Sequence, residues 1–182
     1  MSSIEEAVAA LRAGEPVLLP TDTVYGLCAD PSSEGARGRL AELKGRDAAQ
    51  PTALLFADVE TAVRRIPALE SARSLLPGPY TVVVSHGDGT VGVRVPELPP
   101  AAGGVVAELG AVVATSANRH GGTDPRRLED VPPEIRAACA AELDGGELPG
   151  VPSTVLDLTG PEPRVLREGA VTAAEALARL RG

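Results

Sequence analysis

The apolar and polar residues of this chain alternate with two periods, one typical of helices and one of strands. Ile4, Val8 and Leu11 form a single helical stripe, and Ser3 and Glu6 before it have the spacing of a capping box. Runs such as "PVLLP" and "YTVVVS" are short, apolar and typical of strands. Helices are expected between Ser3 and Gly14 and over 33–43, 58–66, 68–76, 101–110, 132–143 and 172–181, and strands over 16–20, 52–56, 80–85, 90–95, 111–116, 154–158 and 163–167.

These elements predict an α/β fold built on one open, twisted sheet. Helices separate many of the strands, but the turn "HGDG" joins two strands closely enough for a hairpin. We therefore expect a mixed sheet with flanking helices rather than a purely parallel one. The sequence has no internal repeat, no low-complexity block and no long linker, so residues 1–182 are expected to form a single domain.

Composition places the chain among ordinary globular proteins. Hydrophobic residues make up 43% of the chain, and no segment approaches the roughly 18 consecutive apolar residues of a membrane span. The opening "MSSIEEAVAALRAG" lacks the basic start and apolar stretch of a secretory signal. Cys28 and Cys139 lie far apart in apolar surroundings, which favours buried, reduced thiols in a cytosolic protein over a disulfide.

The net charge and the missing motifs argue against several functions. The chain has 17 basic and 25 acidic residues, and the resulting net charge of −8 disfavours a broad nucleic-acid surface. It contains no P-loop, no G-x-G-x-x-G after a strand, no metal-binding spacing of histidines and cysteines, and no G-x-S-x-G. Covalent catalysis and a structural zinc site are therefore not expected.

Polar side chains follow the ends of several predicted strands and of one helix. They occur in "PTDT", "KGR", "VGVRVP", "TSAN", "PST" and "RVLRE". Ligands of open α/β sheets bind beyond strand ends, so these groups are candidates for one common pocket. The pocket would be locally positive because of four cations, Lys44, Arg46, Arg94 and Arg167. This combination suits a nucleoside triphosphate, whose oxygens accept from forked and point-charge donors.

Most of these groups also have an ordinary structural interpretation. Lys44 and Arg46 could complement a helix dipole. Short polar residues at strand ends could form turns or cap helices, which applies to Thr21, Asp22, Thr23, Ser116, Asn118, Asp124 and Ser153. Arg94 is harder to explain in this way, because a cation amid valines needs a partner or a ligand if it faces inward. No role is assigned to His86 and His120.

The order and spacing of these segments resemble the YrdC-like family, the L-threonylcarbamoyladenylate synthases. The resemblance rests on "PTDTVYGL", "LKGR", "GVRVP", "TSAN", "PSTVLDL" and "VLREGAV", and it runs from about residue 10 to residue 172. It implies an open α/β sheet with a concave ligand pocket, in a short form without the C-terminal domain of longer relatives. It also implies that L-threonine, bicarbonate and ATP, with Mg²⁺ accompanying the ATP, give L-threonylcarbamoyl-AMP and pyrophosphate.

The resemblance further implies what the product is for. A separate tRNA threonylcarbamoyl transferase complex uses it to place the N6-threonylcarbamoyl modification on adenosine in tRNA. The implied partners are therefore the small-molecule substrates and, through a hand-off, that complex. Direct nucleic-acid binding is expected to be weak or absent, no membrane is involved, and the location is cytoplasmic.

Carried over by motif, the resemblance also implies roles for individual residues. The catalytic K-x-R and S-x-N signature is matched by Lys44, Arg46, Ser116 and Asn118. Threonine contacts are implied for Thr23, Arg94, Ser116 and Ser153. ATP contacts are implied for Lys44, Arg46, Gln50, Thr90, Ala114, Asn118, Asp124 and Arg167. On this interpretation "TDT" interrupts a strand because hydroxyls and a carboxylate must face an amino-acid ligand.

Two stretches depart from the family pattern. In "KGRDAAQP", Asp47 stands where the family has Pro, while Gln50 remains a candidate for nucleotide binding. Several members place a His at the end of the following strand to help hold threonine, but here "TALLF" ends in Leu54, Leu55 and Phe56. The sequence therefore leaves open how this chain selects threonine.

Three other functions stay open on the sequence. A carbamoyl-adenylate-forming domain of hydrogenase maturation proteins would accompany zinc-finger and acylphosphatase segments, which this chain lacks. A YrdC-like RNA-binding module would have no use for the K-x-R and S-x-N pairs and conflicts with the net charge of −8. A paralogue that adenylates another small carbamate is kept open by the missing His. Threonine-dependent pyrophosphate release separates the first and third from the synthase, and salt-sensitive RNA retention would favour the second.

Overall fold

The computed structural model describes residues 2–47 and 52–181. Its elements in chain order are α1 (Ile4–Arg12), β1 (Val17–Pro20), β2 (Tyr25–Ala29), α2 (Ala36–Lys44), β3 (Ala53–Leu55), α3 (Val59–Arg65), the 3-10 helix η1 (Pro67–Leu75), β4 (Tyr80–His86), β5 (Gly89–Arg94), α4 (Pro100–Leu109), β6 (Val112–Ser116), the 3-10 helix η2 (Leu128–Asp130), α5 (Pro133–Ala137), β7 (Ala141–Glu142), β8 (Thr154–Asp157), β9 (Arg164–Arg167) and α6 (Ala173–Arg181). Within these two ranges, none of the helices has the length and apolar character needed to span a membrane.

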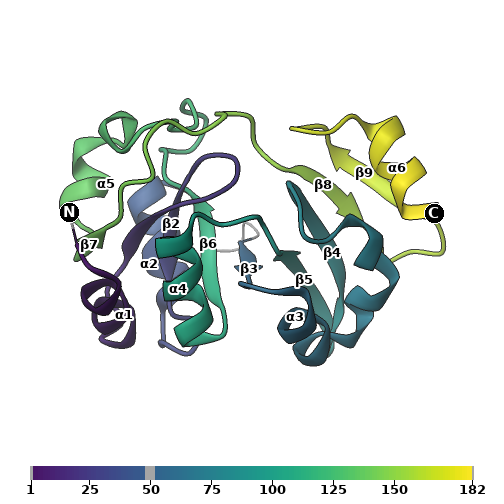
Figure 1. Ribbon diagram of the computed structural model, residues 1–182, viewed down its shortest axis with the longest axis horizontal. Coiled ribbons are helices and arrows are strands. Elements are labelled where there is room, and N and C mark those ends of the chain that lie inside the picture. The colour runs from purple at the N-terminus through teal and green to yellow at the C-terminus, as the bar shows by residue number, and fades with distance from the viewer. Residues whose placement is uncertain (1, 48–51, 182) are drawn as a thin grey trace.

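The strands form one open sheet in the order β7-β1-β2-β6-β3-β5-β4-β8-β9 (Figure 1). Parallel pairs join β1 to β7, β3 to β5 and β4 to β8, and the other neighbours are antiparallel. The predicted mixed α/β sheet is therefore confirmed. The segment 21–23, "TDT", is the turn of the hairpin formed by β1 and β2, in which Pro20 pairs with Tyr25.

Alternate strand residues pack into two apolar clusters on opposite faces of the sheet. The larger cluster contains Leu18 of β1 and side chains of α2, α3, η1, α5 and α6. The smaller one contains Leu19 and side chains of α1 and α4. On β5, the same face as the smaller cluster carries Gly92 and Arg94, which line a pocket instead of packing under a helix. The sheet thus has one face covered along most of its width and one face left open beyond α1 and α4.

Two predicted helix caps and one predicted helix stop are confirmed. The Ser3 side chain accepts a hydrogen bond from the Glu6 backbone N–H, and the Glu6 carboxylate accepts one from the Ser3 N–H, which completes the capping box of α1. Asp58 caps α3 by accepting from the Thr61 N–H at 2.7 Å. Gly14 follows α1 with a φ of 81°, a conformation that glycine adopts without strain.

One predicted helix is wrong in its second half. The segment 132–143 was expected to be a single helix, but α5 ends at Ala137 and β7 follows at Ala141–Glu142. The backbone N–H groups of Ala140 and Leu143 donate to the carbonyls of Pro16 and Leu18, so the segment covers the outer edge of β1. Pairing of a sheet edge therefore outweighs the helix propensity of an alanine-rich run. The predicted helix over 68–76 is found as the 3-10 helix η1.

Both cysteines are free thiols. Cys28 is buried as expected, whereas Cys139 is only half-buried. Burial raises the pKa of each thiol to about 12, so both are protonated at neutral pH.

Candidate active site

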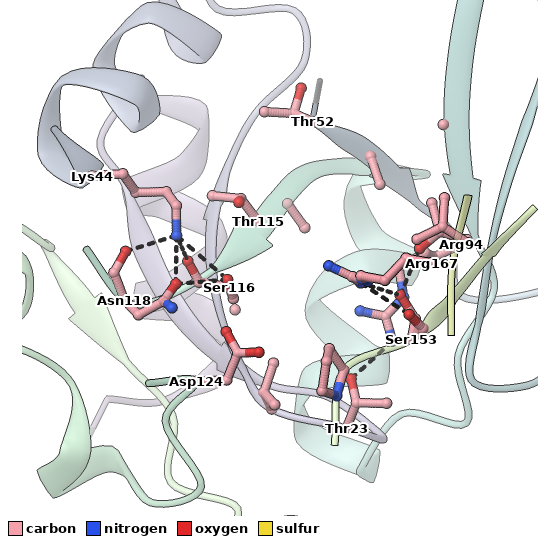
Figure 2. A pocket seen from close by; sticks show the side chains of 18 of the residues that line it. Thr23, Lys44, Thr52, Arg94, Thr115, Ser116, Asn118, Asp124, Ser153 and Arg167 are labelled. Atoms are coloured by element: carbon pink, nitrogen blue, oxygen red, sulfur yellow. Dashed lines mark hydrogen bonds between the residues drawn. The ribbon is translucent and has the colours of Figure 1, made fainter. Parts of the chain in front are cut away.

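A pocket of about 730 Å³ lies on the open face of the sheet. Its volume is within the range of small-molecule sites. All of the site residues predicted from the sequence that the structure describes line it, namely Thr23, Lys44, Arg46, Thr90, Arg94, Ala114, Ser116, Asn118, Asp124, Ser153 and Arg167. Gln50 lies outside the described residues. Figure 2 shows two groups facing each other across the pocket, Lys44 with Ser116 and Asn118, and Arg94 with Arg167 and Ser153.

Lys44, at the C-terminus of α2, ties that helix to the end of β6. Its Nζ donates to the Asn118 carbonyl and to Asn118 Oδ1, each at 2.7 Å, and to the Ser116 carbonyl, with Ser116 Oγ at 3.4 Å. Ser116 Oγ donates to Asn118 Oδ1 at 2.7 Å, and Asn118 Nδ2 donates to the Gly122 carbonyl at 2.6 Å. An ammonium group has three donors, so those of Lys44 are fully used within the protein.

The environment of Lys44 also disfavours its charge. The residue is only 4% exposed, and burial together with the nearby Arg46 guanidinium lowers the pKa of Lys44 to about 8. The Asp124 carboxylate acts in the opposite direction. Lys44 is therefore charged at neutral pH, with a margin of about one pH unit.

Unlike Lys44, Arg46 has donors that no group of the described chain accepts from. Its Nε and Nη2 are buried, yet within the described chain neither has a hydrogen-bond partner. Burial lowers the pKa of the Arg46 guanidinium from its ordinary value, which marks the desolvation of a group that stays charged. Buried donors of a cation are costly when unpaired, so their presence at a pocket wall favours an anionic ligand.

The "TDT" turn arranges a second charged group. Thr21 Oγ1 donates to the Val24 carbonyl at 2.7 Å and accepts from two backbone N–H groups of the turn. Asp22 Oδ1 accepts from Arg94 Nη2 at 2.6 Å, and Thr23 Oγ1 accepts from the same nitrogen at 3.0 Å. The expectation that the carboxylate of this turn faces a ligand is wrong, because Asp22 is not among the residues lining the pocket and instead holds Arg94.

The ion pair of Asp22 and Arg94 is nearly buried. The side chains are 11% and 12% exposed, respectively. Burial raises the pKa of Asp22 and lowers that of Arg94, and in each case the partner's charge counteracts the effect. The pair therefore fixes an arginine at the pocket wall in one orientation, which suits recognition of a planar carboxylate.

Ser153 is held by residues on both sides of β8. Its Oγ lies 2.8 Å from Thr81 Oγ1 of β4, and its carbonyl accepts from Arg167 Nη2 of β9 at 2.9 Å. Ser153 is 4% exposed, whereas Arg167 is exposed at the rim. The hydroxyl of Ser153 is thus oriented by a threonine that the sequence did not single out.

Small residues make the floor of the pocket. Ala114 pairs with Ala53, and Ala53 pairs with Gly92, so the three lie side by side across β6, β3 and β5. All three line the pocket. A Cβ on Gly92 would lie 3.5 Å from Thr81 Cγ2, within the space above the sheet. The floor therefore lets a ligand approach the backbone of the sheet closely.

Sequence reasoning missed several lining residues. Thr52, Thr81 and Thr115 line the pocket, as do the Arg37 and His120 side chains at its rim. Side chains alternate between the two faces of a strand, so Thr81 of β4 lies on the face opposite to its buried neighbours Tyr80 and Val82. This alternation could have indicated Thr81 from the sequence. Nothing in the sequence indicates that Arg37 reaches the pocket. At the end of β3, where several family members place a His, Leu54, Leu55 and Phe56 are buried and none of them lines the pocket.

Known proteins are similar to this chain in sequence and in fold. The family model Sua5/YciO/YrdC, described as telomere recombination, matches residues 9–169. The Bacillus subtilis threonylcarbamoyl-AMP synthase is 34% identical over 187 residues, covering 93% of this chain and 54% of the relative. A Mycobacterium tuberculosis protein, provisionally named a threonylcarbamoyl-AMP synthase, is 37% identical over 185 residues, covering 93% of this chain and 85% of the relative. The crystal structure of Pyrococcus abyssi Sua5 complexed with L-threonine has a TM-score of 0.85 and 32% identity, covering 97% of this chain and 56% of that one.

The coverage differs between these relatives. The chain spans about half the length of the Bacillus protein and of the Pyrococcus structure, but most of the length of the mycobacterial protein. The similarity therefore concerns the region that carries the pocket described above.

Proposed function

The chain belongs to the Sua5/YciO/YrdC family, as its sequence predicts, and we propose that it is a threonylcarbamoyl-AMP synthase. It would form L-threonylcarbamoyl-AMP and pyrophosphate from L-threonine, bicarbonate and ATP in the cytoplasm, and a separate complex would use the product to modify adenosine in tRNA. Two relatives named for this activity, at 34% and 37% identity, support the proposal. The single structural observation that carries it is Arg46, a half-buried cation at the pocket wall with two buried donors that have no partner within the described chain.

The reaction places its largest charge changes beside Arg46. The threonine amine first combines with bicarbonate to give a carbamate and water. A carbamate oxygen then attacks the α-phosphorus of ATP while the bond from that phosphorus to the bridging oxygen breaks, and the electron pair leaves with pyrophosphate. Negative charge grows on the phosphoryl and leaving oxygens, where a fixed guanidinium with free donors stabilises it most.

Lys44, Ser116 and Asn118 act together in this scheme. Because the Lys44 donors are used by Ser116 and Asn118, we assign Lys44 to holding these two residues at the pocket wall and to supplying positive charge there. Ser116 and Asn118 then position the substrates by hydrogen bonds. Thr90, Ala114 and Arg167 are assigned to the nucleotide, as the family motifs imply.

The threonine end of the pocket is assigned to the opposite group. Arg94, held by Asp22, would bind the threonine carboxylate, and Thr23 would accept or donate beside it. Ser153, oriented by Thr81, would complete the contacts. Selection of threonine would then depend on the hydroxyl groups of Thr81 in β4 and of Ser153 just before β8, rather than on an imidazole at the end of β3.

Mg²⁺ is expected to enter with ATP. The described chain has no group of three or more metal-ligating side chains, so a dedicated protein cage for the ion is not found there. Mg²⁺ bound by substrate phosphates needs only one or two carboxylates and keeps several waters. Asp124 lines the pocket near Lys44 and would be the carboxylate that meets the ion, whose charge offsets that of the phosphates.

The proposal is tested by pyrophosphate release. The protein is incubated with ATP, Mg²⁺, bicarbonate and L-threonine, and threonine or bicarbonate is left out in turn. We expect release to need both and to fall about 100-fold or more in Arg46→Ala. Arg39→Ala is the matched control, because Arg39 is on the same helix as Lys44 but pairs with Glu15 at 2.8 Å outside the pocket. Release that persists without threonine would contradict the proposal and indicate another carbamate acceptor.

A further inference from the structure

Arg37 is a cation at the pocket rim whose role the family motifs do not cover. It lies in α2, about two turns before Lys44 and on the same side of the helix. Its side chain lines the pocket, although the residue is exposed. Within the described chain it makes neither a hydrogen bond nor an ion pair, so its guanidinium is free to bind a ligand.

The arginines around Arg37 differ from it in this respect. Arg39, two residues further along α2, pairs with Glu15. Arg119, which also lines the rim, pairs with Glu134, and Arg127 pairs with Glu147. Elsewhere on the surface of the described chain several arginines, such as Arg65 and Arg181, also lack a carboxylate partner, but they do not line the pocket. Of the exposed arginines that line the pocket in the described chain, Arg119 pairs with Glu134 and Arg167 donates to the Ser153 carbonyl, whereas Arg37 has no protein partner.

The place of Arg37 in α2 also runs against helix electrostatics. The first turn of α2 has no acidic residue, and its N-cap Gly35 provides no side-chain cap. A cation near a helix N-terminus is disfavoured by the helix dipole. When a charge is unfavourable at its position and no neighbouring group compensates it, the residue often serves a function there.

The two cations of the K-x-R motif offer few free donors to the phosphates of the proposed substrate. Lys44 has no free donor, and Arg46 offers two buried nitrogens. A triphosphate carries several anionic oxygens beyond the one attacked, and the leaving pyrophosphate carries the charge released by bond cleavage. We propose that Arg37 binds the terminal phosphates of ATP and the pyrophosphate formed from them. This inference rests on the proposed function, because it names a further contact of the same substrate.

Binding of three probes to the free protein separates this role from others. ATP, AMP and inorganic pyrophosphate are titrated calorimetrically into the wild type, Arg37→Ala, Arg37→Lys and the matched control Arg39→Ala. A charge-assisted hydrogen bond at an exposed site leads us to expect about 10-fold weaker binding of ATP and pyrophosphate to Arg37→Ala. Binding of AMP should change less than about 2-fold, and Arg37→Lys should recover most of the loss, because a point charge suffices for phosphate.

Two results would overturn the inference. One is equal affinity of Arg37→Ala and Arg39→Ala for pyrophosphate and ATP. The other is an equal loss for AMP, which would place Arg37 at the nucleoside or in the fold. If ATP binding responds as expected while pyrophosphate release proves independent of threonine, the contact stands and the proposed synthase activity fails.

Discussion

The ion pair of Asp22 with Arg94 makes a specific prediction for Asp22→Asn. The substitution keeps the size of the side chain and one acceptor for Arg94 Nη2, which now lies 2.6 Å from Asp22 Oδ1. It removes the negative charge that compensates Arg94, whose side chain is only 12% exposed. Arg94 would then be a nearly buried cation with two neutral acceptors, and its orientation at the pocket wall would no longer be fixed.

The size of the effect follows from the burial of the pair. Removing one partner of a buried ion pair outright costs about 3–5 kcal/mol, and this range is expected for Asp22→Ala. An Asn at this position still accepts a hydrogen bond from Arg94, about half as strong as the bond to a carboxylate. We therefore expect Asp22→Asn to lose about 2 kcal/mol in the free energy of unfolding. In a domain of this size that loss lowers Tm by about 4–8 °C. The KM for threonine should rise about 10-fold or more while the KM for ATP stays within about 2-fold.

Thermal unfolding and steady-state kinetics measure the two effects separately. The double variant Asp22→Leu with Arg94→Met removes both charges, and it should recover most of the stability without recovering threonine binding. A Tm of Asp22→Asn within about 1 °C of the wild type would refute the claim that the pair is energetically important. A KM for ATP that rises as much as the KM for threonine would refute the assignment of Arg94 to threonine.

Three further predictions concern pH, the backbone beside Ser153 and the orientation of its hydroxyl. Because burial lowers the pKa of Lys44 to about 8 from its ordinary 10.5, the folded state binds fewer protons than the unfolded state between these values. The free energy of unfolding measured with urea should therefore rise between about pH 8 and 10.5, relative to that of Lys44→Met. Over the same range kcat should fall, because the ammonium group is lost. In Gly169→Ala the new Cβ would lie 2.6 Å from the Ser153 backbone carbon, so unfolding by urea should show a loss of about 1–3 kcal/mol; Gly160→Ala, whose Cβ would have a nearest neighbour at 3.9 Å, should show none. Thr81→Val should raise the KM for threonine several-fold with ATP saturation unchanged, and an unaltered KM would mean that Ser153 needs no orienting partner.

The elements that the sequence predicts well are those with a strong local signal. The capping box of Ser3 and Glu6 and the cap at Asp58 define helix starts without help from the rest of the chain. The alternation within β4 and β5 likewise identifies the strands, because one face of each is buried. Such features depend on residues close in sequence, so composition and spacing suffice to predict them.

The errors arise where a distant part of the chain decides the structure. The run that follows Ala137 has the composition of a helix, but it pairs with the edge of β1, more than a hundred residues earlier in the chain. Asp22 likewise has a carboxylate that suits a ligand site, and only its contact with Arg94 of β5 shows that it acts on another side chain. Pairing between remote strands leaves no periodic signal that a single sequence could reveal.

Part of the pocket lining was predictable from the sequence, but its arrangement was not. Motif order predicted residues such as Ser116 of β6, Ser153 just before β8 and Arg167 of β9, which the fold brings to one pocket. It did not predict that Lys44 would have its donors used within the protein while those of Arg46 remain unpaired. It also did not find Thr81 or Arg37, because neither belongs to a motif and only the register and the helix direction bring them to the pocket. The roles assigned to all these residues remain predictions for the experiments above.

The most direct test of the central claim is the identity of the adenylate. The protein is incubated with ATP, Mg²⁺, L-threonine and isotopically labelled bicarbonate, and the nucleotide products are separated and identified by mass. The account predicts that label enters a nucleotide with the mass of threonylcarbamoyl-AMP, in equal amount to the pyrophosphate released, and that neither product forms without threonine. Label in an adenylate that lacks threonine, or pyrophosphate formed with no labelled nucleotide, would contradict it.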